Sequence, residues 1–158
     1  MWCAVWDFEV SSELSIGESV LTELQERAVA DGVALRVGLV LEQNGAVLLL
    51  QREEHPSARS PLNLPGTIVR AGERLSTAIA RALYEETALT VVDIRRHLGS
   101  FDYLDNAGKH VRREHFAVDA AATGPIRLSN YWGYRWLPLD GELPVTSSIR
   151  AILTDYRK

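Results

Sequence analysis

The sequence predicts a mixed α+β domain in which helices cover the faces of a sheet. Helical periodicity appears near the N-terminus, in the middle and at the C-terminus, and the segments between them alternate with the two-residue period of strands. The elements follow the order helix, hairpin, loop, helix, several strands and helix. The length of 158 residues and the hydrophobic fraction of 46% are those of one globular domain.

The first helix is expected from about residue 17 to residue 30. Ser15 and Glu18 have the spacing of a capping box, and Gly32 ends the helix. Three apolar side chains share one helical face: Leu21, Leu24 and Ala28. Trp2 and Trp6 precede this helix and are expected to pack against the domain or a partner subunit.

A strand and a hairpin follow the first helix. Leu35, Val37, Leu39 and Leu41 alternate with more polar positions and predict a strand with one buried side. Asn44-Gly45 predicts a tight turn, because this pair tolerates positive φ angles. Residues 46–50 return as the second strand. The segment 52–65 holds three prolines among charged and serine residues and predicts a loop.

The second half of the chain predicts a helix followed by strands. Residues 75–87 have apolar side chains at helical spacing and contain no glycine or proline. Strands are expected at 90–94, 97–103 and 111–120, and the turn at 105–108 joins the last two.

The C-terminal region predicts one more strand and a helix. Residues 134–139 are expected to form the strand, and Pro144 with Thr146 or Ser147 opens the helix. The apolar face of this helix combines four side chains: Ile149, Ile152, Leu153 and Tyr156.

Charge and cysteine content exclude several classes of function. A net charge of −4 supplies no long-range field to gather nucleic acid, so we expect no nucleic-acid partner. The single cysteine, Cys3, cannot form an internal disulfide, which favours a reducing, cytoplasmic location. The longest apolar run, residues 46–50, is too short to span a bilayer, so no membrane association is expected.

One stretch carries the residue types needed for phosphate chemistry. It begins with Leu64-Pro65-Gly66, continues to Glu73, and ends in the predicted helix with Arg81, Glu85 and Glu86. This pattern resembles the box of the Nudix hydrolases, Gx5Ex7REUxEExGU, in which U is a bulky aliphatic residue. The resemblance covers residues 34–155 and implies an α/β/α sandwich of the Nudix type with a mixed curved sheet. Residues 1–33 would then be an N-terminal segment and helix packed on a Nudix domain at 34–158.

The spacing of the box is intact, but three of its letters differ. Glu73 takes the first glutamate position, Arg81 the arginine, and Glu85 and Glu86 the paired glutamates. Leu83 and Leu89 take the aliphatic positions. Three residues depart from the pattern: Thr67 stands for the first glycine, Ala82 for the glutamate after the arginine, and Ala88 for the last glycine.

The resemblance implies a metal and a role for each box residue. Glu85 and Glu86 would hold Mg²⁺, or Mn²⁺, with the Gly66 carbonyl nearby, because carboxylates and carbonyls suit this hard cation. Arg81 and Glu73 would orient the helix and the loop. A bland alternative exists, since Arg81 and Glu85 also have the spacing of an ordinary exposed helix pair.

Several residues outside the helix are candidates for substrate binding. Arg52 ends a strand where relatives often place a phosphate-binding arginine, although a surface charge is an equal alternative. Phe101 and Tyr103, or Trp132, are suited to stacking on a base or to packing in the core. Asn130 takes the position where relatives carry a further acid and would coordinate weakly through its carbonyl.

Three further polar positions have open roles. Arg70 is either a solvated charge or a phosphate contact, and His110 and His115 are expected to be a surface and a strand-packed histidine.

The loss of an acid at position 82 leaves the general base unassigned. In the family this position supplies a metal ligand and often the base. Asp102, Asp105 and Glu114 are candidates for compensating this loss. An alanine leaves room for an outward side chain, so Ala82→Glu is expected to restore the three-acid face.

Two functions from different classes follow. The first is Mg²⁺-dependent hydrolysis of a nucleoside diphosphate linked to another moiety, with a small-molecule nucleotide or nucleoside diphosphate derivative as the partner. The second is a catalytically weak or silent Nudix domain that binds a nucleotide or a protein. A homodimer is common in the family, and the sequence leaves the oligomeric state open.

Overall fold

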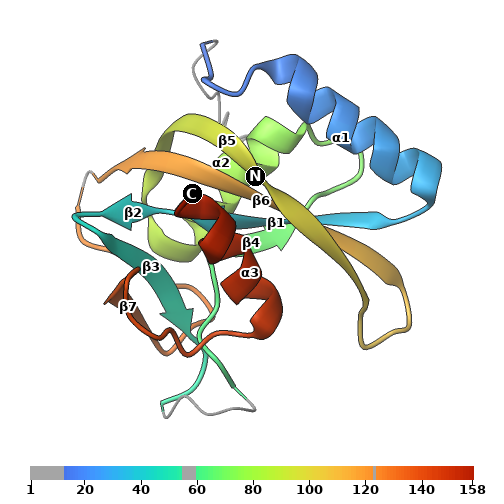
Figure 1. The fold of residues 1–158 in the computed structure, drawn as a ribbon. Coiled ribbons are helices and arrows are strands. Elements are labelled where there is room, and N and C mark those ends of the chain that lie inside the picture. Colours follow the sequence, from blue (N-terminus) through green and yellow to red (C-terminus); the bar gives the residue numbers. More distant parts are fainter. Residues whose placement is uncertain (1–12, 55–59, 123) are drawn as a thin grey trace, which may run out of the picture.

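The computed structural model describes residues 13–54, 60–122 and 124–158, which form two sheets and three helices (Figure 1). Trp2, Cys3 and Trp6 lie outside these residues, so their expected roles stay predictions. None of the helices in the described part is long and apolar enough to cross a bilayer.

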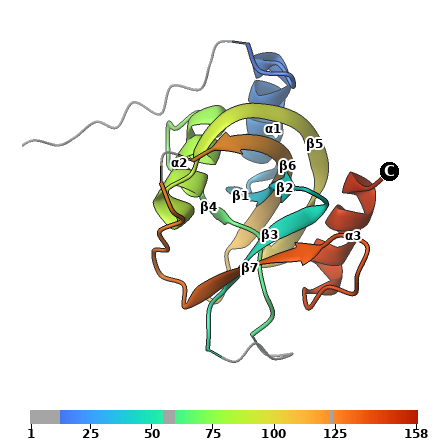
Figure 2. The ribbon, with the colours of Figure 1, turned by 90° about the vertical axis from the view of Figure 1, so that its left-hand side faces the viewer.

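The larger sheet is mixed and has four strands in the order β4-β1-β6-β5. β1 runs parallel to β6 and antiparallel to β4, and β5 runs antiparallel to β6. Their bounds are β1 Ala34–Val40, β4 Gly66–Ile68, β5 Thr90–Leu104 and β6 His110–Ala121. Figure 2 shows the strong curvature of β5 and β6.

The smaller sheet is antiparallel and has the order β2-β3-β7. Its strands are β2 Glu42–Gln43, β3 Ala46–Gln51 and β7 Gly133–Pro138. β3 pairs over its whole length with β7, which brings residues far apart in the sequence side by side.

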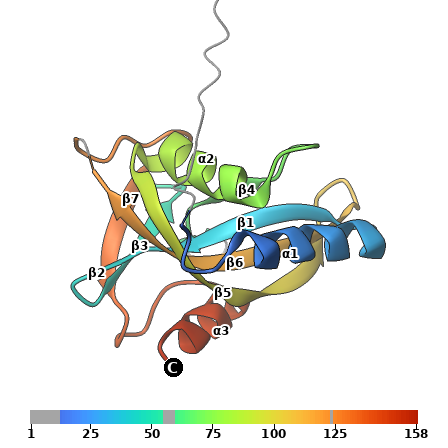
Figure 3. The ribbon, with the colours of Figure 1, turned by 90° about the horizontal axis from the view of Figure 1, so that it is seen from above.

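Helices lie on both sides of the larger sheet (Figure 3). α2, Leu75–Thr87, covers one side, and α3, Ser147–Tyr156, covers the other. α1, Glu18–Asp31, contacts both α2 and β1. The expected α/β/α sandwich with a mixed curved sheet is therefore confirmed.

Two apolar cores fill these layers. The first packs α2 against one face of β1 and β6 and includes Val37, Leu39 and Phe116. The second packs α3 against the opposite face and includes Val40 and Ile149. Burial of a large apolar side chain contributes about 1.5–3 kcal/mol, so these two cores supply most of the favourable free energy of folding.

Several sequence predictions agree with the structure. The predicted helix at 75–87 has the bounds of α2. Asn44 and Gly45 have φ angles of 53° and 81°, which is the positive-φ turn that their residue types favour. Thr146 caps α3, because its hydroxyl oxygen accepts a hydrogen bond from the Ile149 amide at 3.3 Å.

The predicted capping box at Ser15 and Glu18 is wrong. Gly17 is the N-cap of α1, and no side chain caps this helix end. Ser15 instead donates a backbone hydrogen bond to Asp93 at 2.9 Å and a second hydrogen bond from its hydroxyl to the same carboxylate. A tertiary partner on β5 therefore replaces the local cap.

The strand predictions need three corrections. β1 and β3 belong to different sheets, and only the short β2 pairs with β3 beside the turn. The predicted strands 90–94 and 97–103 are one strand, β5, because the interruption is a series of bulges rather than a break. β4 forms directly after the predicted loop, where only tertiary pairing with β1 stabilises three extended residues.

The alternation predicted for β1 holds on one face only. Gly38 and Val40, which alternate with Val37 and Leu39, are also buried, because α3 covers the second face of the sheet.

A buried histidine should make stability depend on pH. His115 is fully buried on β6, and burial, with a smaller contribution from the charge of Arg113, lowers its pKa to about 3. Between pH 6.5 and 3 the unfolded chain binds a proton that the native chain does not, so the free energy of unfolding falls as the pH falls. The free energy of unfolding of the wild-type chain should fall between pH 6.5 and 5, and we expect His115→Leu to reduce this fall by about 1–2 kcal/mol, measured by urea unfolding.

His110→Gln is the control for this measurement, because His110 is exposed and its substitution should leave the pH slope unchanged. An unchanged slope in His115→Leu would contradict the prediction.

Candidate functional site

A buried ion pair ties the loop before α2 to the helix itself. The Arg81 side chain is only 5% exposed, and its Nε and Nη2 donate to the two oxygens of Glu73 at 2.8 and 2.9 Å. Nη2 also donates to the Ile68 carbonyl at 2.7 Å. One guanidinium therefore fixes the positions of β4, the loop and α2 relative to one another.

The electrostatics of this pair favour its charged form. Burial raises the pKa of Glu73, but the hydrogen bonds from Arg81 and the Arg70 amide outweigh it, and the net pKa is lowered. The hydrogen bonds to Glu73 raise the pKa of Arg81. Both groups stay ionised, so the pair keeps its geometry across the neutral pH range.

α1 braces the same region from outside. Arg74, the N-cap of α2, makes no side-chain cap. Gln25 on α1 takes this role, because its Oε1 accepts from the Leu75 amide at 3.0 Å and its Nε2 donates to the Glu73 carbonyl at 2.9 Å. Ser76 donates to the Glu18 carboxylate at 3.1 Å.

The two paired glutamates have different environments. Glu86 accepts a hydrogen bond from the Gly66 amide at 3.2 Å, and its Oε2 is buried with no hydrogen-bond partner among the described residues. Glu85 has a half-exposed side chain and lies near Arg81 at 3.2 Å and Arg70 at 3.8 Å. The structure therefore gives Arg70 an ion pair at the rim of the site.

Burial makes Glu86 unusually basic for a carboxylate. It raises the pKa of this group to about 7, although the Gly66 amide, the Tyr131 hydroxyl and the charges of Arg113 and Arg52 lower it. An acid with a strongly perturbed pKa in a cleft is characteristic of functional sites.

Two adjoining cavities open beside these glutamates. The acidic compartment has a volume of about 440 Å³ and is lined by Arg36, Arg52, Gly66, Thr67, Glu85, Glu86, Ser129, Asn130 and Tyr131. The aromatic compartment has a volume of about 380 Å³. It shares Arg36, Arg52, Gly66, Thr67 and Tyr131 with the first and adds Val37, Asn63, Leu64, Phe101, Tyr103, Arg113, Thr146, Ser148 and Ile149.

The structure brings most of the predicted site residues to this cleft. Glu85, Glu86, Gly66, Arg52 and Asn130 line the acidic compartment. Phe101 and Tyr103 line the aromatic compartment. Arg81 and Glu73 line neither compartment and instead form the buried ion pair that fixes α2 to the preceding loop. Trp132 is 59% exposed and lines neither compartment, so the structure does not place it with the other aromatic candidates.

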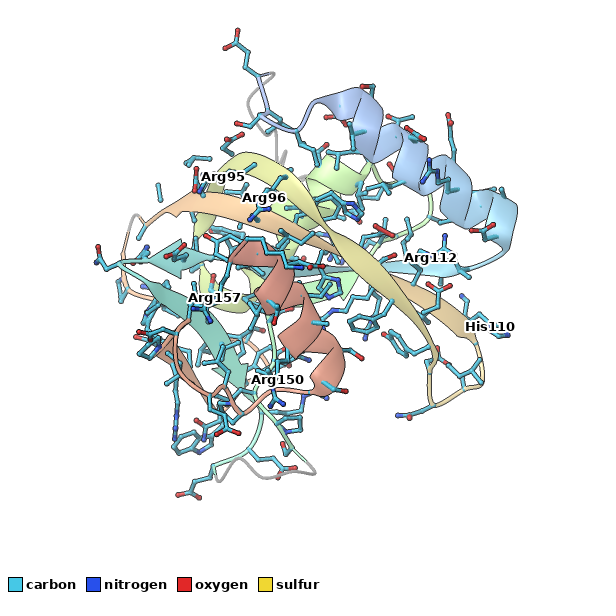
Figure 4. The ribbon with its side chains drawn as sticks, in the orientation of Figure 1. Arg95, Arg96, His110, Arg112, Arg150 and Arg157 are labelled. Carbon is cyan, nitrogen blue, oxygen red and sulfur yellow. The ribbon has the colours of Figure 1, made fainter. Side chains whose placement is uncertain are left out.

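None of the three candidate bases reaches this cleft. Asp102 pairs with Arg112, which also pairs with Asp31 at the end of α1 (Figure 4). Asp105 accepts two backbone hydrogen bonds inside its own turn. Glu114 is buried and lies 2.5 Å from His97.

Sequence reasoning missed several polar residues of the cleft, among them Arg36, Asn63, Arg113 and Tyr131. Arg36 and Arg113 are directly opposite each other on β1 and β6, and Phe101 lies opposite Arg113 on β5. One signal could have identified Arg113. It lies on the same side of β6 as Val111 and His115, which are buried, so its charge should face inward.

The expectation that position 82 has room for an outward side chain is wrong. Ala82 is fully buried and belongs to the first apolar core, with Leu83 and Ile79. Helical spacing shows that positions 82 and 86 share a face, but Ala82 lies in the core between α2 and the larger sheet and is covered there.

The donor set of the cleft is small. Among the described residues, no group of three or more His, Cys, Asp or Glu side chains is arranged to hold a metal ion. Two carboxylates remain, from Glu85 and Glu86. Mg²⁺ is often bound through one or two carboxylates together with phosphates of a substrate, so this set fits a metal that a bound phosphate completes.

Comparisons with known proteins agree on one fold. A model of the NUDIX domain matches residues 33–153. The solved structure of the Escherichia coli ORF135 protein has a TM-score of 0.65 at 18% identity, over 79% of this chain and 89% of that chain. No curated protein matches the sequence.

Two structural neighbours contain nucleotide ligands or act on them, by their descriptions. One is a binary complex of the Caenorhabditis elegans Ap4A hydrolase, with a TM-score of 0.62 at 21% identity over 79% of this chain and 96% of that chain. The other is the NUDIX domain of Shewanella oneidensis NrtR complexed with ADP ribose, with a TM-score of 0.61 at 20% identity over 84% and 96%.

The burial of position 82 reverses the expected effect of an acid there. We expect Ala82→Glu to lower the free energy of unfolding by about 2–4 kcal/mol, because a larger, charged side chain enters a packed apolar core. Urea unfolding measures this change. Ala151→Glu, at an exposed position of α3, is the control and should change stability by less than about 0.5 kcal/mol. A stable Ala82→Glu protein with increased turnover would contradict this prediction.

Proposed function

Because this chain belongs to the NUDIX domain family, we propose that it hydrolyses a nucleoside diphosphate linked to another moiety, with Mg²⁺ or Mn²⁺ as the cofactor. One observation carries the proposal: Glu86 keeps a buried oxygen without a hydrogen-bond partner among the described residues, in a cleft that also holds arginines. Such an oxygen is costly to bury unless a ligand satisfies it.

The two carboxylates of the cleft are the proposed metal ligands. Glu85 and Glu86 would hold the cation, with the Gly66 carbonyl and the Asn130 side chain as further oxygen donors. When bound, the cation would neutralise charge on the diphosphate and lower the pKa of a bound water. Arg81 and Glu73 would keep α2 and its loop in position during this chemistry, which is the supporting role of groups behind metal ligands.

The remaining side chains have roles in substrate binding. Arg52 and Arg36 line both compartments and would bind the phosphates through charge-assisted hydrogen bonds. Phe101 and Tyr103 would stack against a base in the aromatic compartment. The two nucleotide-related neighbours support a nucleotide derivative as the small-molecule partner.

Glu85 is the proposed acceptor of the proton from the attacking water. No acid is present at position 82, and Asp102, Asp105 and Glu114 line neither compartment of the cleft, whereas Glu85 does. Glu85 is half exposed, so it can pass a proton to solvent. The cytoplasmic location and a homodimer stay predictions.

A second candidate function is a binding module without turnover. The observation that favours it is the small donor set. The family pattern has a third carboxylate at position 82, where this chain has an alanine. Incubation with a panel of dinucleotides and nucleotides and Mg²⁺, followed by chromatography of the products, separates the two functions. Cleavage supports the hydrolase, whereas affinity without cleavage supports the module.

Removal of the Glu86 charge should separate activity from stability. The raised pKa of this group means that its ionised form destabilises the native state, and this loss grows as pH rises from 4.5 through about 7. We therefore expect Glu86→Gln to reduce Mg²⁺-dependent turnover by about 10²-fold or more while Tm at pH 8 stays equal or rises. Steady-state kinetics and a melting curve measure the two effects.

Glu26→Gln, on the exposed surface of α1, is the matched control and should change neither quantity. A lower Tm with unchanged turnover in Glu86→Gln would assign this side chain a structural role instead.

Metal and nucleotide should stabilise the protein together. With only two carboxylates, Mg²⁺ alone is expected to bind weakly, and a nucleotide phosphate would complete its coordination. We expect the Tm shift with Mg²⁺ and ADP-ribose together to exceed the sum of the separate shifts, because each would raise the affinity of the native state for the other. Differential scanning fluorimetry measures this, and Glu86→Gln should abolish the excess. Additive shifts with ADP-ribose, Ap4A and nucleoside triphosphates would argue against a substrate-bridged metal.

A further inference from the structure

The aromatic compartment contains an arginine whose charge has no carboxylate partner. The Arg113 guanidinium donates from Nη1 to the Asn63 side-chain oxygen at 3.0 Å and from Nη2 to the Leu64 carbonyl at 3.2 Å. Both acceptors are neutral. A guanidinium has five N–H donors, so three of them have no acceptor among the described residues.

Its neighbours on the sheet increase the positive charge instead of balancing it. Arg36 on β1 and Phe101 on β5 lie directly opposite Arg113. Like charges directly opposite each other destabilise a sheet. Burial is the main cause that lowers the pKa of Arg113; the charge of Arg36 lowers it further, whereas Tyr103, Tyr131 and Glu86 raise it. Neither Arg113 nor Arg36 has a carboxylate within ion-pair distance among the described residues, so an anionic group of a ligand can bind beside them.

Two glycines bring the guanidinium close to the sheet. A Cβ atom at Gly38 would lie 2.9 Å from Arg113 Nε, and one at Gly66 would lie 3.1 Å from its Nη2. The nearest atom to such a Cβ is the Val37 carbonyl oxygen at Gly66, at 2.0 Å, and the His115 ring at Gly38, at 2.7 Å, so the guanidinium lies in a part of the sheet where only glycine fits.

Three other arginines of the described chain have an acidic partner or lie in a cavity with acids. Arg112, the next residue on β6, faces Asp102 and pairs with it at 2.8 Å. A cavity of about 670 Å³ beside α3 carries Arg95 and Arg96, but Glu42 and Asp140 line it as well (Figure 4).

The position of Arg113 separates its role from that of the other two arginines. Arg36 and Arg52 line both compartments, so they lie where a diphosphate bound at Glu86 would extend. Arg113 lines the aromatic compartment only. Arg113 is therefore placed to meet a group that extends from the diphosphate into the aromatic compartment.

We propose that the aromatic compartment binds a phosphomonoester group, held by Arg113, that the substrate carries in addition to its diphosphate. This inference rests on the proposed function, because it places the diphosphate at Glu86. The substrate would then be a diphosphate-linked nucleotide with a further phosphate on its nucleoside part. A guanidinium binds such a group through parallel hydrogen bonds.

Matched pairs of compounds that differ by one phosphate test the proposal. NADPH carries a phosphomonoester that NADH lacks, and coenzyme A carries one that dephospho-coenzyme A lacks. We expect the full chain to bind the phosphorylated member of at least one pair about 10- to 100-fold more tightly, measured by isothermal titration in Mg²⁺ and again in EDTA. Arg113→Gln should abolish this preference and leave the affinity for the unphosphorylated member unchanged.

Arg112→Gln is the control, because it removes the same charge from the other face of the same strand and should keep the preference. If Arg113→Gln fails to fold, Arg113→Lys tests the same point, since a lysine keeps the charge but lacks the paired donors and should weaken the preference. Equal affinities within both pairs for the wild-type chain, no binding of any of the four compounds, or a preference that survives in Arg113→Gln would overturn the proposal.

Binding of these compounds by titration and their cleavage followed by chromatography are separate results, and together they distinguish this inference from the proposed hydrolysis. A phosphate preference without any cleavage would support the phosphate site and overturn the hydrolase. Cleavage without a preference would do the reverse.

Discussion

The buried pair of Arg81 and Glu73 is the interaction on which the rest of the site depends. It connects the loop, α2 and the Ile68 carbonyl of β4 through one guanidinium. Removal of one partner would leave an uncompensated buried charge, which costs about 3–5 kcal/mol. The positions of Glu85 and Glu86 follow from it, since both lie one turn farther along the helix that this pair holds.

Sequence reasoning succeeded where the signal was local. The bounds of α2 follow from apolar spacing without glycine or proline, and the Thr146 cap follows from a hydroxyl at the start of a helix. The resemblance to the Nudix box singled out Glu85 and Glu86, and both line the cleft, although their role stays a prediction. It failed where the deciding contact came from elsewhere in the chain. Ser15 hydrogen-bonds to Asp93 and does not cap α1, and no short-range pattern identifies such a distant partner.

The arginines of the cleft illustrate the same limit. Arg36 and Arg113 are cross-strand neighbours in a parallel pair, although 76 residues separate them in the sequence numbering (113 minus 36, less one). A period of two assigns each to a face of its own strand but cannot say which strands become neighbours. Ala82 is the opposite case. Its helix face was assigned correctly, but it was expected to be exposed and is fully buried.

The brace from α1 has a consequence for how such a site diverges. The shared domain begins at residue 33, yet Gln25 and Glu18 hydrogen-bond to the first residues of α2. Substitutions in α1 can therefore shift α2 without altering any residue of the box. Selection can thus adjust the cleft through α1 while every position of the box, including the three that depart from the family pattern, stays as it is.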